Sequence, residues 1–137
     1  GVNRGEADSA KIEAVRVLVA RVAGRTQFVI PVQAQGELFG VLLKAGADRA
    51  QARDVVVHFA NTFDSADSAG VTLFSALDLA VAHRLQVWDA LIVCAAAEAG
   101  CSMLLSEDMQ DGFVWRGLTL VDPFAPSLHP RLAALAG

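Results

Sequence analysis

Residues 87–124 have the sequence VWDALIVCAAAEAGCSMLLSEDMQDGFVWRGLTLVDPF, which gives the clearest indication of the chain's architecture. The segment from Asp89 to Gly100 is almost entirely apolar and ends in glycine, as expected for a buried helix. Residues 102–108 and 117–124 are short apolar runs whose polar residues lie at their carboxyl ends, a pattern typical of buried strands. Strands that alternate with helices predict an α/β fold with a mainly parallel sheet.

The same alternation extends toward the N-terminus. FVIP at 28–31 has the β-branched, proline-terminated pattern of a short buried strand. The other elements predicted upstream are an amphipathic helix over 7–23, helices over 32–45 and 48–63, a loop over 64–70 with a brief edge strand, and a helix ending near Arg84.

Composition limits the possible functions. The chain has 137 residues, 54% of them hydrophobic and 19% charged, which fits one compact domain and excludes intrinsic disorder. Its longest apolar run, Ala90–Ala97, is far shorter than the roughly 18 residues that cross a bilayer. A net charge of -4 argues against a broad basic surface for duplex nucleic acid. Cys94 and Cys101 lack disulfide-framework or zinc spacing, so we expect a cytoplasmic protein.

The predicted domain covers residues 1–124 and leaves a C-terminal tail, 125–137, as either a docked helix or a loose end. The chain opens with Gly-Val-Asn and goes directly into a helix, whereas open parallel sheets usually begin with a central strand. We therefore expect a processed product or a fragment that lacks its first strand.

Three acidic residues stand at positions where an open parallel sheet binds its ligands. Asp108 follows the strand MLL, Asp89 stands at a helix start, and Glu37 lies inside an otherwise apolar helix. Asp89 could also serve only to cap its helix. Carboxylates that converge from separate elements repel one another, and bound Mg²⁺ or Mn²⁺ relieves that repulsion and favours phosphodiester hydrolysis.

The run from Val87 to Phe124 resembles PIN-domain ribonucleases of the VapC-like toxin type, through its WDALI helix start, AAAEAGC helix end, SEDMQ strand end and closing GLTLVDPF strand. IPVQAQGELFGVLL, residues 30–43, is similar to the segment that bears the family's helical acid, so the resemblance covers nearly the whole chain. It implies a three-layer sandwich around a central, mainly parallel sheet.

The resemblance also implies a function and a site. Glu37, Asp89 and Asp108 match three of the family's four metal-binding acids, and Asp111 is a possible accessory. The fourth acid ends the family's opening strand, and no residue here matches it. The implied activity is that of an Mg²⁺- or Mn²⁺-dependent endoribonuclease, the toxin of a toxin–antitoxin pair. Its implied partners are RNA, a small antitoxin bound beside Glu37, Lys44 and Trp88, and a second copy of the chain.

Two alternatives belong to other functional classes. Without its first aspartate, the chain could be a non-catalytic PIN-like module that binds proteins. It could also be a receiver-like phospho-acceptor domain, although no paired acids follow a first strand. Trp88 could stack on a base or on a partner side chain, but we expect it to pack in the core. We expect Val19, Val22, Phe59 and Phe63 to provide the surplus apolar surface of a dimer.

Overall fold

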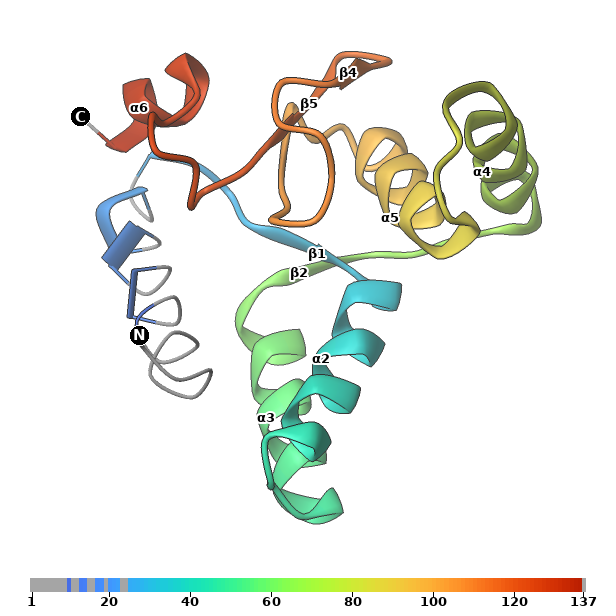
Figure 1. The fold of residues 1–137 in the computed structure, drawn as a ribbon. Helices are drawn as coiled ribbons and strands as arrows, with labels where there is room; N and C mark the ends of the chain where they lie inside the picture. Colours follow the sequence, from blue (N-terminus) through green and yellow to red (C-terminus); the bar gives the residue numbers. More distant parts are fainter. Residues whose placement is uncertain (1–9, 11–12, 15–16, 19, 23–24, 137) are drawn as a thin grey trace. The chain divides into compact units, whose positions relative to one another are not determined.

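The computed structural model describes residues 10, 13–14, 17–18, 20–22 and 25–136, and it shows a mixed α/β architecture (Figure 1). Its labelled elements are β1 (Val29–Pro31), α2 (Val32–Lys44), α3 (Arg49–Thr62), β2 (Asp64–Ala66), α4 (Gly70–His83), α5 (Val87–Glu98), β3 (Met103–Leu105), β4 (Val114–Trp115), β5 (Leu118–Val121) and α6 (Pro130–Ala136). No helix in this part of the chain is long and apolar enough to cross a membrane. The coarse prediction of an α/β chain with parallel strand pairing is confirmed.

The chain divides into two compact units. Unit 1 consists of Gly1–Gln27, Met103–Trp115 and Thr119–Gly137, and unit 2 consists of Phe28–Ser102 and Arg116–Leu118. Each unit has its own small sheet. The β3–β5–β4 sheet of unit 1 is mixed, because β3 pairs with β5 in parallel and β4 joins β5 through a hairpin turn, whereas β1–β2 in unit 2 is a parallel pair. The turn between β4 and β5 and the first residue of β5 are assigned to unit 2.

In unit 2, β1 leads directly into α2. Its residues pair in parallel with β2, from Val29 opposite Asp64 to Pro31 opposite Ala66. Pro31 ends the strand because it has no N–H to donate, and its φ of -57° is suited to the start of a helix. The edge strand expected within 64–70 is therefore β2, and its carboxyl end lies at the same edge of the sheet as that of β1.

Helix α5 carries much of the buried apolar surface in unit 2. All seven residues from Ala90 to Ala96 are buried, and none of them is charged, as expected for a helix that is enclosed on every side. α4 packs along α5 through its own buried residues, Ala76 and Leu79 (Figure 1). The same helix leaves Val71, Phe74 and Val81 more than half exposed.

In unit 1, β3 pairs in parallel with β5, and a two-residue turn joins β5 to β4. The turn residues Arg116 and Gly117 both have positive φ, 49° and 79°, as in the turns whose twist matches that of a hairpin. β4 was not predicted, because a two-residue strand is too short to show a period in the sequence.

The C-terminal tail forms α6, which settles the choice between a docked helix and a loose end. Leu132 is only 2% exposed, and Arg131 Nη1 donates a hydrogen bond to Thr119 Oγ1 at 2.9 Å. At the other end of the helix, Arg25 Nη1 donates to the Leu135 carbonyl at 2.9 Å. A guanidinium suits this position because the last carbonyls of a helix have no intrahelical donor.

Several predicted details differ from the structure. α5 begins at Val87, two residues earlier than predicted, because Gln86 is the last residue with extended backbone. The strands predicted over 102–108 and 117–124 are shorter in the structure, where they are β3 and β5, because the backbone turns soon after the last paired residue of each strand. The described residues of the predicted 7–23 helix are helical, and its other residues, including Val19, lie outside the described part. Val22 was expected at the surface, but it is buried.

Candidate functional site

The three predicted acids stand on three different elements. Glu37 lies in the second turn of α2 and is exposed, whereas Asp89 lies in the first turn of α5 and is half-buried. Asp108 is exposed and follows β3 by three residues. Glu37 and Asp89 belong to unit 2, and Asp108 belongs to unit 1.

Within unit 2, the supporting elements of Glu37 and Asp89 touch one another. α2 contacts α5, and both helices contact β1. α2 starts at the carboxyl end of β1, which is the edge of a parallel sheet where ligands bind. Unit 2 therefore holds two of the three predicted carboxylates, on two helices that both contact β1.

Asp89 is not the N-cap of α5. The N-cap is Gln86, which makes no side-chain capping hydrogen bond, and Asp89 is the third residue of the helix. A carboxylate in a first turn is stabilised by the partial positive charge of the helix N-terminus. The capping interpretation is thus wrong in its strict form, and the interaction with the helix dipole remains.

In unit 1, Asp111 anchors the loop that carries Asp108. Asp111 Oδ1 accepts a hydrogen bond from the backbone N–H of Asp122 at 2.9 Å, and Asp122 Oδ1 accepts one from Phe124 N–H at 2.8 Å. The first bond ties the loop after β3 to the residues that follow β5, and the second fixes the backbone of those residues. The structure thus shows a local anchoring role for Asp111, while its accessory role toward a metal stays a prediction.

Sequence reasoning did not select Asp122, although it directly follows a strand. Its position before proline was the available signal, because an aspartate there tends to bond to the backbone two residues ahead. The parallel pairing of β3 with β5 places the carboxyl ends of these strands, and thus Asp108 and Asp122, at the same edge of the sheet.

Two glutamines of α2 were also missed. Gln35 is 9% exposed, and its Nε2 lies 3.1 Å from the Ile30 carbonyl and 2.8 Å from Ser65 Oγ. One turn before Glu37, Gln33 Nε2 donates to Ser68 Oγ at 2.6 Å. These bonds connect α2 to β1, β2 and the loop after β2. Gln33 Oε1 is buried and has no hydrogen-bond partner in the described part of the chain.

The donor chemistry of the predicted set suits a hard cation, because all three side chains are carboxylates. The described residues do not, however, bring together any group of three or more histidine, cysteine, aspartate or glutamate side chains that could hold a metal ion. Of the three predicted metal ligands, two lie in unit 2 and one lies in unit 1.

The comparisons with known proteins found no match for this chain. A scan of family models found none that fits it, and no curated protein sequence is significantly similar to it. The assignment to PIN-domain ribonucleases therefore rests on the quoted motifs.

Cys94, His129 and Trp88 are the other side chains that the sequence offered for chemistry or stacking. Burial raises the pKa of the Cys94 thiol to about 11, which keeps the thiol neutral and unsuited to nucleophilic attack. His129 Nδ1 accepts a hydrogen bond from Arg131 N–H at 3.2 Å, next to the start of α6. Trp88 was expected to pack in the core, but it is 62% exposed, because its position in the first turn of α5 precedes the buried run.

Proposed function

We propose that this chain is a metal-dependent endoribonuclease of the PIN-domain type that acts in the cytoplasm on RNA. The observation that carries the proposal is the placement of Glu37 and Asp89 on α2 and α5, two contacting helices that share β1. This placement agrees with the motif resemblance, in which the same two residues and Asp108 supply carboxylate ligands.

In this proposal Glu37, Asp89 and Asp108 hold one or two Mg²⁺ or Mn²⁺ ions. When bound, such an ion lowers the pKa of a water molecule and neutralises charge on the scissile phosphate. The side chains contribute oxygen ligands of fixed charge. Gln35 and Gln33 position α2 by holding it to β1, β2 and the loop that follows β2.

The finer fold proposed is the three-layer PIN-like sandwich with one further parallel strand upstream of residue 1. β1 and β3 support this proposal, because each is an edge strand of its own sheet and pairs in parallel with its one neighbour among the described residues. An added strand whose last residues include an aspartate would supply the fourth carboxylate. Such a strand should slow amide hydrogen exchange along the edge strand with which it pairs.

The first experiment measures RNA cleavage by the product of the complete reading frame. We expect single-stranded or loop RNA to be cut with Mg²⁺ or Mn²⁺ and not with EDTA. Asp89→Asn and Asp108→Asn should each lower the rate by at least about 100-fold, since each removes a metal ligand. Asp78→Asn, a matched change at an exposed acid of α4, should leave the rate unchanged.

The same proteins distinguish the enzyme from its main alternative. Cleavage that survives EDTA and both ligand substitutions would contradict the metal-dependent mechanism. The absence of cleavage and of Mn²⁺ binding by calorimetry would favour the alternative, a non-catalytic PIN-like module that binds proteins. We expect the 137-residue chain alone to bind Mn²⁺ more weakly than the complete product.

A second experiment tests the toxin–antitoxin part of the proposal, which includes a homodimer and a small antitoxin. An arginine or lysine from the antitoxin would compete with the metal for the carboxylates near Glu37. Expression of the complete gene alone should slow growth, and co-expression of the adjacent small gene should restore it. Normal growth in the first case, together with a monomer by light scattering at micromolar concentration, would contradict the toxin assignment.

A further inference from the structure

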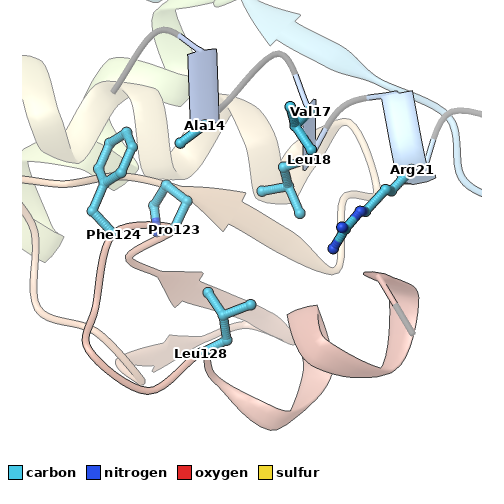
Figure 2. Close-up of a pocket in the computed structure, with 7 residues that line it drawn as sticks. All are labelled: Ala14, Val17, Leu18, Arg21, Pro123, Phe124 and Leu128. Carbon is cyan, nitrogen blue, oxygen red and sulfur yellow. The ribbon is translucent and has the colours of Figure 1, made fainter. Parts of the chain in front are cut away.

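Unit 1 contains an apolar pocket of about 170 Å³, in a part of the molecule that the proposed nuclease site does not use (Figure 2). One wall comes from the N-terminal helical residues Ala14, Val17, Leu18 and Arg21, which lie on one helix face because their spacing is i, i+3, i+4 and i+7. The other wall comes from the segment after β5, with Pro123, Phe124 and Leu128.

The pocket has an apolar end and a charged end. Figure 2 shows Leu18 and Leu128 pointing toward each other across the opening, with Pro123 and Phe124 at one end and Arg21 at the other. The hydrogen bond from Phe124 N–H to Asp122 Oδ1 and the restricted φ of proline fix the wall after β5. This wall of the pocket is therefore fixed before any ligand arrives.

Arg21 is free to bind a ligand. Its side chain is exposed and makes no hydrogen bond or ion pair with any described residue. The two other described arginines of unit 1 are engaged, Arg25 with the Leu135 carbonyl and Arg131 with Thr119 Oγ1. An unpaired guanidinium beside an apolar pocket favours a ligand that joins an apolar group to a carboxylate.

The size of the pocket indicates the source of that ligand. A cavity of roughly 150 Å³ holds one benzene molecule, whereas most small-molecule sites occupy about 300–1,000 Å³. Val17 and Leu128 are each 38% exposed, so the pocket opens to solvent and would leave a free metabolite incompletely covered. A single anchoring side chain from another protein suits both observations.

We propose that this pocket binds a peptide segment of a partner protein that places a phenylalanine or leucine side chain between Leu18 and Leu128 and an adjacent aspartate or glutamate against Arg21. The proposal is independent of the nuclease function, because no predicted metal ligand lines the pocket. It differs from the predicted antitoxin surface near Glu37, Lys44 and Trp88.

The test is a titration of the ¹⁵N-labelled 137-residue chain followed by NMR. The probe is acetyl-Gly-Asp-Phe-Gly-amide, compared with peptides that carry Asn or Lys for Asp, or Ala for Phe. We expect amide shifts at Val17, Phe124 and Leu128, with binding about fivefold weaker for the Asn peptide and weaker still for the Lys and Ala peptides. Arg21→Gln should make the Asp and Asn peptides bind equally.

Two further variants test the apolar part. Leu128→Asp places a carboxylate in the pocket and should abolish binding, whereas Val114→Asp, at a 60% exposed position of β4, should not. Arg53→Gln makes the same charge change as Arg21→Gln in unit 2 and should have no effect. Preserved spectra confirm that each variant folds.

A titration with phenylacetate tests whether a small molecule with an aromatic ring and a carboxylate binds the pocket as well as the peptide does. The proposal is overturned if the Asp peptide causes no shifts at pocket residues, or if Arg21→Gln leaves the preference for Asp over Asn intact. Binding of phenylacetate as tight as that of the Asp peptide would also overturn it, because the ligand would then be a free carboxylate rather than a partner segment.

Discussion

At the scale of single residues, the predicted acids Glu37 and Asp108 differ from the Cys94 thiol in their exposure to solvent. Glu37 and Asp108 are exposed, so their carboxylates are accessible to a cation from solvent. Cys94 has no exposed surface, and desolvation outweighs the nearby positive charge of Arg116 in setting its pKa. The exposed acids are thus available for chemistry, and Cys94 contributes to packing.

The raised pKa of Cys94 predicts a specific pH dependence of stability. The thiol has its ordinary pKa of 9.0 in the unfolded chain, and burial raises its pKa to about 11 in the folded chain, so the unfolded state loses the proton first. The free energy of unfolding should therefore fall as pH rises from about 9 to 11, by at most about 1.4 kcal/mol per pH unit, and be insensitive to this group below that window.

Urea unfolding in a Cys101→Ala background, which leaves Cys94 as the one thiol, measures the effect. Adding Cys94→Ala should flatten the pH dependence, and the absence of tyrosine keeps the background titration small in this range. An unchanged slope would show that Cys94 does not carry the effect.

At the scale of elements, α3 shows how local sequence fixes a helix start. Asp48 Oδ1 accepts a hydrogen bond from Gln51 N–H at 2.8 Å, and Gln51 Oε1 accepts one from Asp48 N–H at 3.2 Å. This reciprocal pair satisfies a donor that the helix itself cannot, which explains why a helix beginning at Asp48 could be predicted.

Asp48→Ala removes the cap and should lower the free energy of unfolding by about 1 kcal/mol. Asp54→Ala is the matched control on the same helix, because Asp54 is 70% exposed and pairs only with its neighbour Arg53. That change should stay within about 0.5 kcal/mol. Equal losses in the two variants, measured by chemical denaturation, would contradict a specific role for the cap.

At the scale of the whole molecule, the proposed metal site predicts a link between ligand binding and stability. Acidic residues outnumber basic ones by 15 to 11, and Mg²⁺ bound at the proposed site would stabilise the folded state, because it binds the folded and not the unfolded chain. At a free Mg²⁺ concentration about tenfold above Kd the gain is about 1.4 kcal/mol, or a few degrees in Tm.

Thermal unfolding should show this rise in Tm for the unsubstituted protein and a smaller one for Asp89→Asn. Asp78→Asn should behave like the unsubstituted protein, and KCl at matched ionic strength should not reproduce the shift. The same rise in Asp89→Asn would mean that Asp89 does not contribute to metal binding.

The sequence by itself determined most of the helices, the existence of β1, β3 and β5, and the elements that carry Glu37, Asp89 and Asp108. These features depend on periodicity, caps and glycine stops, which act over a few residues along the chain. Only the tertiary structure paired β1 with β2, buried Val22, exposed Trp88 and joined Asp111 to Asp122. These outcomes depend on contacts between segments far apart in sequence, and no local pattern encodes which segments those are.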